Sequence, residues 1–190
     1  MSIAPEKTLI LLKPDTVQRA IIGQVITRFE QKGFHVAAMK MVKPTEQQLG
    51  LHYADDKAWK ISVGKKTKET FAAKGLTMNE TEEQIGDRIR NWNIDALRQP
   101  VVAIVFEGHH AVEVGRILVG DTECRKAAPG TIRGDFSCDG YQKADEDKRV
   151  IRNLVHASGS VKEAEHEIPI WFTKEELFDY PRHDWNIMHA

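Results

Sequence analysis

The stretch Asn153-Leu154-Val155-His156-Ala157-Ser158-Gly159-Ser160 joins an apolar run to the start of a helix. The apolar run from Val150 to His156 is typical of a strand, and the pattern from Ser160 to Trp171 predicts a helix. A histidine at the end of such a run can be held rigidly, with one ring nitrogen facing a cleft. We therefore expect this junction to organise both the fold and the site.

Further elements follow on the N-terminal side. Apolar and β-branched runs predict strands at residues 8–12, 34–42 and 101–106. Helical spacing predicts helices at residues 21–29, 79–92 and 110–118, and Thr45 with Gln48 forms a capping box at the start of another. Residues 126–135 are rich in glycine, proline and charge, and we expect a loop. The order of elements predicts an α/β sandwich built on one sheet.

The length of 190 residues suits one domain, which we place over residues 1–190. Two stretches look inserted into it. Residues 57–99 are long for a connection, with a basic first half up to Lys74, and residues 139–149 are polar and charged. Both are expected to border the functional cleft.

The composition excludes several classes of protein. Hydrophobic residues make up 41% and charged residues 29%, which suits a folded core. The net charge of −1 favours neither nucleic acid nor anionic lipid as the main partner. Two cysteines, Cys124 and Cys138, match no metal or redox spacing. No apolar segment is typical of a signal or a membrane span, so we expect a cytoplasmic protein without a membrane partner.

His156 is the candidate nucleophile. A neutral imidazole is nucleophilic near pH 7, and a carboxylate on its far nitrogen would fix the tautomer and stabilise positive charge. Glu167 follows at one or two helical turns and is the candidate carboxylate. On spacing alone, such a histidine is more often a capping or core residue.

Phosphate chemistry also needs cations. Lys13 at a strand end, Arg116 on a helix before Thr122, and Arg133 between glycines are the candidates. Each taken singly is more often a solvated surface charge. The chain has neither a Walker-type loop nor a Gly-x-Gly-x-x-Gly motif, so the usual phosphate loops are absent. The adjacent pair His109 and His110 is weak evidence for a metal.

Together, these segments resemble nucleoside diphosphate kinases. The segment from Asn153 to Ile168 is similar to the active-site signature of that family, and four more blocks agree in the family's order. They are residues 8–19, residues 28–39, residues 101–121 with Gly115-Arg116, and residues 129–136. The resemblance covers the chain apart from the two insertions.

The resemblance implies transfer of the γ-phosphate of a nucleoside triphosphate to a nucleoside diphosphate, by a ping-pong cycle through phosphorylated His156. It implies a ferredoxin-like fold with a four-stranded antiparallel sheet and flanking helices, assembled as a homo-oligomer, either a tetramer or a hexamer. It also implies Mg²⁺ bridging the nucleotide phosphates, with no metal ligand assigned in the chain.

The resemblance also implies roles for individual residues. Glu167 would orient His156, Ser158 would bond to Glu167, and Tyr53 would stand beside His156. The remaining implied contacts are with the nucleotide: Lys13 and Asn153 with the ribose 3′-hydroxyl, Lys13 also with the transferred phosphate, Arg116, Thr122 and Arg133 with the phosphates, and Val150 with the base.

The chain departs from the family at two places, one near the magnesium and phosphates and one near the base. Gly159 stands where the family usually has an aspartate near magnesium and phosphate, so metal affinity is open to change. The family's base-stacking phenylalanine has no clear counterpart in residues 57–99, and Trp59 is the nearest aromatic candidate. Stacking reads no base edge, so it predicts broad nucleotide specificity.

Two other functions fit the sequence less well. A non-catalytic relative that binds nucleotide or a partner through its insertion is expected to have lost Lys13, Arg116, Arg133 or His156, and all four are present. A nucleic-acid-binding role is disfavoured by the near-zero charge, although the basic stretch 57–74 leaves it open as a secondary role.

Overall fold

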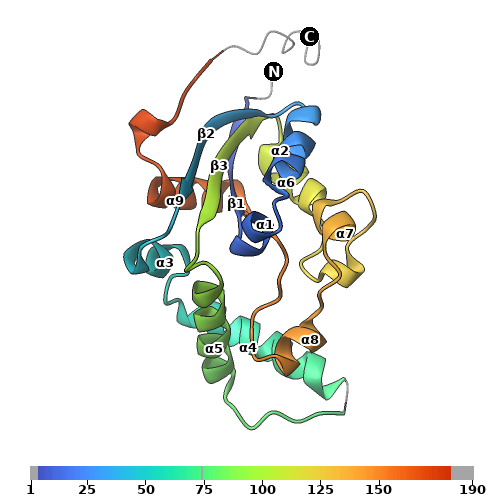
Figure 1. Ribbon diagram of the computed structural model, residues 1–190. Coiled ribbons are helices and arrows are strands. Elements are labelled where there is room, and N and C mark those ends of the chain that lie inside the picture. The colour runs from blue at the N-terminus through green and yellow to red at the C-terminus, as the bar shows by residue number, and fades with distance from the viewer. Residues whose placement is uncertain (1–3, 74, 181–190) are drawn as a thin grey trace.

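A four-stranded antiparallel sheet lies at the centre of the molecule (Figure 1), whose computed structural model describes residues 4–73 and 75–180. The strand order is β2-β3-β1-β4, and every neighbouring pair is antiparallel. The strands are β1 (Glu6–Leu12), β2 (His35–Val42), β3 (Val101–Gly108) and β4 (Val155–Ala157). This is the ferredoxin-like arrangement that the resemblance implied.

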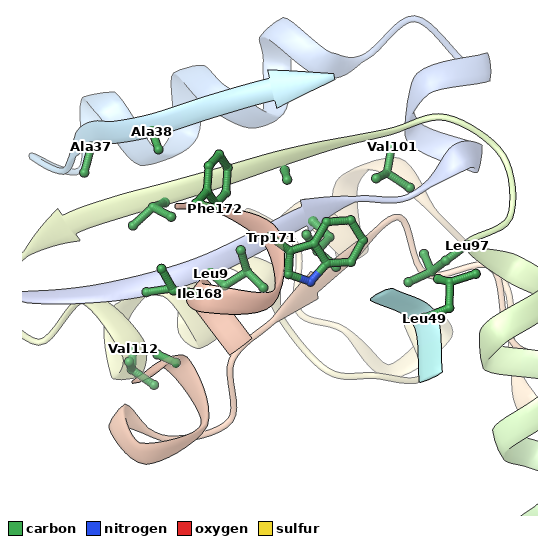
Figure 2. Close-up of a cluster of buried hydrophobic side chains, with 14 of the residues drawn as sticks. Leu9, Ala37, Ala38, Leu49, Leu97, Val101, Val112, Ile168, Trp171 and Phe172 are labelled. Carbon is green, nitrogen blue, oxygen red and sulfur yellow. The ribbon is translucent and has the colours of Figure 1, made fainter. Parts of the chain in front are cut away.

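Alternating side chains of the central strands fill two cores. Leu9 and Leu11 enter one core, whereas Ile10 and Leu12 enter the other, because successive strand residues point to opposite faces. The first core lies against α3 (Glu46–His52) and α9 (Val161–Trp171), and Figure 2 shows Trp171 and Ile168 directed toward the sheet there. The second core lies against α2 (Ile22–Gln31), α6 (Ala111–Val119) and α7 (Ile132–Phe136).

A helical hairpin projects beyond the sheet. It consists of α4 (Lys57–Ala72) and α5 (Glu82–Ala96), and Figure 1 shows it below the sheet, near α8 (Tyr141–Glu146). The two helices cross at glycines: a Cβ at Gly64 would lie 2.0 Å from the carbonyl oxygen of Glu82, and one at Gly86 would lie 2.4 Å from that of Lys60. The long stretch 57–99 is therefore mostly regular helix. Helix α5 agrees with the expected helix at residues 79–92, although it begins and ends a few residues later.

The expected strand from Val150 to His156 is wrong in length, because the structure has strand only at Val155–Ala157. Two features delay its start until Val155. Leu154 has a positive φ of 68°, which breaks an extended run, and the backbone N–H of Arg152 donates to Asp139 rather than to a strand. Residues 150–153 therefore form a bent segment that borders a cavity.

The expected loop at residues 126–135 is wrong in part, because it contains the first residues of α7. Thr131 caps this short helix by accepting a hydrogen bond from the N–H of Gly134 at 3.1 Å. Four more short elements were not foreseen: α1 (Pro14–Gln18), α8, the 3₁₀ turn η1 (Cys124–Lys126) and the 3₁₀ turn η2 (Lys174–Glu176).

The segment after α9 returns to the edge of the sheet. The N–H of Phe178 donates to the carbonyl of Ala37 at 2.8 Å, and the Tyr180 hydroxyl donates to the carbonyl of Val36 at 3.0 Å. The rest of the expected tail, residues 181–190, lies outside the described residues, as does Lys74 of the basic stretch. Within the described ranges no helix is both long and apolar enough to cross a membrane.

Candidate active site

His156 stands on the short strand β4, opposite Leu11 of β1. Its Nε2 atom lies 2.8 Å from Oε1 of Glu167, which comes from α9. The ring also lines a cavity of about 870 Å³, so Nδ1, the nitrogen that does not face Glu167, is the one available to a ligand. The predicted pairing of the two residues is present.

Glu167 is buried and is held through both oxygens. Its Oε1 faces His156, and its Oε2 accepts a hydrogen bond of 2.6 Å from the Ser158 hydroxyl. Burial alone would raise the pKa of this carboxyl, but the hydrogen bonds from His156 and Ser158 and the nearby histidine charge lower it below its usual value. An ionised carboxylate only accepts hydrogen bonds, so His156 carries its proton on Nε2 and has a lone pair on Nδ1.

His52 lies between Tyr53 and His156, and it was not among the residues predicted from the sequence. Its ring contacts both neighbours edge-on, with centroid distances of 4.8 Å to Tyr53 and 4.5 Å to His156. Tyr53 lines the same cavity as His156, as the resemblance implied, but it reaches the nucleophile through His52. The only sequence signal for His52 was its position directly before Tyr53.

The atoms of His52, His156 and Glu167 lie close enough for a metal, within 4.8 Å of one another. Magnesium prefers oxygen ligands, so two imidazoles make a poor site for it. Glu167 instead pairs with His156 at 2.8 Å, and Nδ1 of His52 accepts a hydrogen bond from the Trp171 indole at 3.4 Å.

Lys13 follows β1 and points into the cavity. Its Nζ atom donates to Oδ1 of Asn153 at 2.7 Å, and both side chains are buried. Burial, with the nearby charge of Arg133, lowers the pKa of Lys13 to about 8. The two residues that the resemblance assigned to the ribose are therefore in direct contact.

Arg133 is buried and fixes the backbone around the nucleophile. Its guanidinium donates to the carbonyls of Asn153 at 3.0 Å, Gly120 at 3.0 Å and Val155 at 2.7 Å. A guanidinium has five N–H donors, so two remain for an anion in the cavity that Arg133 lines. The sequence predicts a phosphate contact for Arg133, and no motif indicates this structural role.

The other predicted residues lie at two ends of the cavity. Arg116 and Thr122 lie at the end that contains His156, and both are exposed. Val150 and Trp59 lie where α4, α5 and α8 form the wall, and one face of α4 supplies Val63, Thr67 and Phe71 beside Trp59. Residues of both stretches, 57–99 and 139–149, therefore line the cavity.

Of the predicted site residues, nine line this one cavity: Lys13, Tyr53, Trp59, Arg116, Thr122, Arg133, Val150, Asn153 and His156. Ser158 and Glu167 lie behind His156 and act on it from the protein side. Gly159 also lines the cavity, and its N–H donates to Oε2 of Glu163 at 2.6 Å.

A family model described as nucleoside diphosphate kinase matches residues 6–78 and 91–177 of the chain. The chain belongs to the nucleoside diphosphate kinase family. The unmatched residues 79–90 fall at the start of α5 and just before it.

Relatives within this family match almost the whole chain. A nucleoside diphosphate kinase of Pyrobaculum aerophilum is 39% identical over 180 residues, covering 92% of this chain and 98% of the relative. Human nucleoside diphosphate kinase B is 40% identical over 182 residues, covering 95% of each.

Solved structures of the family share the fold. The crystal structure of an NDP kinase from Pyrobaculum aerophilum matches with a TM-score of 0.89 at 38% identity, covering 93% of this chain and all of that one. A transition-state mimic of the Borrelia burgdorferi nucleoside-diphosphate kinase, with bound vanadate and ADP, matches with a TM-score of 0.79 at 34% identity. It covers 97% of this chain and 96% of that one.

Proposed function

We propose that this protein is a nucleoside diphosphate kinase that transfers the γ-phosphate of a nucleoside triphosphate to a nucleoside diphosphate through phosphorylated His156. The observation that carries the proposal is the chain Ser158–Glu167–His156, which leaves Nδ1 of His156 free at a cavity lined by Lys13, Arg116 and Arg133. A nucleophile backed by a carboxylate and faced by cations is the arrangement that phosphoryl transfer requires.

The first half-reaction uses the lone pair on Nδ1. A bond forms from Nδ1 to the γ-phosphorus, the bond from that phosphorus to the β,γ-bridging oxygen breaks, and the nucleoside diphosphate leaves with the bonding electrons. The imidazole gains positive charge in this step, and the Glu167 carboxylate at 2.8 Å stabilises it. A second nucleoside diphosphate then reverses the step, attacking phosphorus through its β-phosphate oxygen.

The phosphate end of the cavity supplies positive charge and donors. Lys13, Arg116 and Arg133 neutralise the phosphate oxygens, and the Thr122 hydroxyl adds a neutral donor. Lys13 and Asn153, which already contact each other, hold the ribose 3′-hydroxyl between them. Because Arg133 also fixes the carbonyls of residues 153 and 155, its charge is held at a constant distance from His156.

The base end offers apolar side chains among polar ones. We place the base between Val150 on one side and the exposed face of α4 on the other, where Trp59 is the aromatic candidate for stacking. Both residues line the cavity, and Trp59 is partly exposed. Apolar contact with the face of a base predicts acceptance of several bases.

Magnesium belongs to this proposal as the ion that accompanies the nucleotide. When bound, Mg²⁺ would supply positive charge that offsets the charge developing on the leaving oxygen. The cavity residues fit such an ion, because the cavity lining includes a carboxylate, Glu163, on the His156 side. The phosphates themselves would supply most of the oxygen ligands.

The test is phosphate labelling of the protein by γ-labelled ATP. We expect an acid-labile, base-stable label on the wild type and none on His156→Gln. His110→Asn is the matched control, since His110 is exposed and has a left-handed φ of 54° that asparagine tolerates. An unlabelled wild type would contradict the proposal and favour a non-catalytic, nucleotide-binding relative.

Three further expectations stay predictions. One is assembly into a tetramer or hexamer, which sedimentation would test. Another is a cytoplasmic location. The last is the division of residues 1–190 into one domain with insertions near 57–99 and 139–149. Deleting residues 62–79 tests the role of the first insertion, because unchanged nucleotide KM values would show that it does not shape the cavity.

A further inference from the structure

The loop after His156 brings the carboxylate of Glu163 back toward the nucleophile. Glu163 lies in the first turn of α9, where Ser160 caps the helix by accepting a hydrogen bond from the Glu163 N–H at 3.1 Å. Its side chain then folds over the loop, and Oε2 accepts a hydrogen bond of 2.6 Å from the N–H of Gly159. The carboxylate is thereby fixed beside residue 159.

Glycine at position 159 makes room for this carboxylate. A Cβ on residue 159 would lie 2.5 Å from Oε2 of Glu163 and 3.3 Å from its Oε1. Any side chain at this position would therefore displace the Glu163 carboxylate. Gly159 and Glu163 together place one carboxylate where residue 159 would otherwise place its own side chain.

Glu163 lines the same cavity as His156, and its second oxygen is available. Within residues 4–73 and 75–180, Oε2 bonds to Gly159 while Oε1 has no hydrogen-bond partner. Only one other carboxylate, that of Asp145 on α8, lines the cavity within those ranges. Glu163 is thus the carboxylate that shares the His156 end of the cavity with Lys13, Arg116 and Arg133.

A bare carboxylate at this point opposes the binding of phosphate. Two negative groups in one cavity repel each other unless a cation lies between them. Mg²⁺ commonly takes one or two protein carboxylates together with substrate phosphates, and keeps several waters. The carboxylate is therefore costly for a metal-free nucleotide and favourable for its magnesium complex.

We propose that Glu163, positioned by Gly159, is the protein ligand of the divalent cation that accompanies the nucleotide, contacting it directly or through a water. This inference rests on the proposed function, because it requires nucleotide phosphates beside His156. The ordinary role of such a glutamate is to close the first turn of a helix, and the experiment below separates the two roles.

The experiment measures ADP binding to the full-length protein by calorimetry, once with Mg²⁺ and once with EDTA. We expect Glu163→Gln to reduce the strengthening of ADP binding by Mg²⁺ on the order of tenfold. The same variant is expected to bind metal-free ADP as tightly as the wild type or more tightly, because a repelling charge is gone. Loss of a purely structural contact would instead weaken binding in both conditions.

Two further variants sharpen the test. Glu165→Gln is the matched control: Glu165 is exposed on the same helix and does not line the cavity, so its magnesium effect should equal that of the wild type. The double variant Gly159→Asp with Glu163→Ala moves the carboxylate to position 159, and we expect it to regain most of the magnesium effect.

The outcomes separate the two proposals. If ADP binds and Glu163→Gln keeps the full magnesium effect, Glu163 is not a metal ligand and the proposed function stands. Equal losses in magnesium and in EDTA would assign Glu163 a structural role only, and would also overturn the inference. If the wild type binds ADP neither with Mg²⁺ nor with EDTA, the proposed function itself is wrong.

Discussion

His52 packs edge-on against His156, with ring centroids 4.5 Å apart and ring planes inclined by 80°. The His52 side chain is fully buried, and its Nδ1 accepts a hydrogen bond from the Trp171 indole at 3.4 Å. Burial, together with the nearby His156, lowers the pKa of His52 to about 3. His52 is therefore neutral at physiological pH and acts on His156 by contact rather than by charge.

Substitution of His52 should separate its volume from its polarity. His52→Ala removes the surface behind the nucleophile, and we expect labelling of His156 by ATP to slow about ten- to a hundredfold, because a small displacement of a reacting group is costly. His52→Phe keeps the ring and should stay within about tenfold of wild type. It should also lower the free energy of unfolding by about 1–3 kcal/mol, because the Trp171 N–H loses its acceptor. Equal losses of rate in both variants would contradict a packing role.

Ser158 should stabilise the fold through Glu167. Its hydroxyl is fully buried, donates to Oε2 of Glu167 at 2.6 Å and accepts from the N–H of Leu9 at 3.2 Å. We expect Ser158→Ala to lose about 2–3 kcal/mol of unfolding free energy at pH 7, measured in urea. Ser62→Ala, at an exposed position of α4, is the control and should lose none.

The effect of Ser158→Ala should depend on pH. The folded-state pKa of Glu167 lies below its unfolded value, so its ionisation stabilises the protein above the unfolded pKa. That stabilisation is lost as the pH falls through the folded pKa. The gap between wild type and Ser158→Ala should therefore be full at neutral pH and shrink in acid; an unchanged gap would show that the Glu167 charge is not involved.

Elements with strong local signals were predictable from the sequence. The runs in β1 and β3 are apolar at nearly every position, and central strands buried on both faces need that pattern. The capping box of Thr45 and Gln48 marks the start of α3, and both of its hydrogen bonds are present. The pairing of His156 with Glu167 was also predictable, because both lie close together in the chain.

Features that depend on distant residues were not predictable. Helix α4 carries apolar and charged residues around its whole circumference, and its position depends on the glycine crossing with α5. The late start of the last strand, at Val155, depends in part on Asp139, 13 residues before Arg152. The carbonyl contacts of Arg133 likewise join residues that are 13 to 22 positions apart. Local periodicity reports none of these.

The crossing of α4 and α5 should not tolerate a methyl group. In Gly86→Ala the new Cβ would lie 2.4 Å from the carbonyl oxygen of Lys60 and 2.5 Å from its Cα, and both are backbone atoms. We expect a loss of about 1–3 kcal/mol in thermal unfolding, despite the better helix propensity of alanine. The control is Gly50→Ala in α3, where no atom lies within 4 Å of the new Cβ. There the same change should stabilise by about 0.4–1 kcal/mol, and a stabilising Gly86→Ala would show that the helices are free to separate.

Asp139 should position the base-contacting segment. Both of its oxygens bond to the guanidinium of Arg149, at 2.6 and 3.2 Å, and Oδ2 also accepts from the N–H of Arg152 at 2.7 Å. Arg149 in turn donates to the carbonyl of Val150 at 3.1 Å. We expect Asp139→Asn to raise the KM for nucleotides about three- to tenfold and to leave kcat within about twofold, because it alters binding of the base rather than the phosphoryl step.

The control for Asp139→Asn is Glu146→Gln, on the exposed side of α8, where Glu146 contacts Gln142. Its KM and kcat should match those of the wild type. A fall in kcat without a change in KM for Asp139→Asn would contradict a role at the base and indicate a disturbed nucleophile.

Lys13 should make nucleotide binding depend on pH. Burial and Arg133 lower its pKa to about 8, so the free protein loses this charge as the pH rises through 8. Phosphate oxygens favour the charged lysine and should raise its pKa, so binding near pH 8 takes up a proton. We expect ADP affinity to fall between pH 7 and 9, with proton uptake seen by calorimetry in buffers of different ionisation enthalpy. Lys162→Met, at an exposed position of α9, should keep both effects.

Lys13 should also lower the stability of the nucleotide-free protein. Its folded pKa of about 8 lies below the ordinary value of 10.5, so at pH values between the two the unfolded chain binds the extra proton and stability rises with pH. Below pH 8 the full cost of burying the charge, about 3 kcal/mol, applies. Lys13→Met should therefore raise the free energy of unfolding at pH 7 while weakening ADP binding and removing its proton uptake. A Lys13→Met protein that is less stable at pH 7 would contradict the cost of burying this charge. A variant that still takes up a proton when ADP binds would show that Lys13 is not the group that gains it.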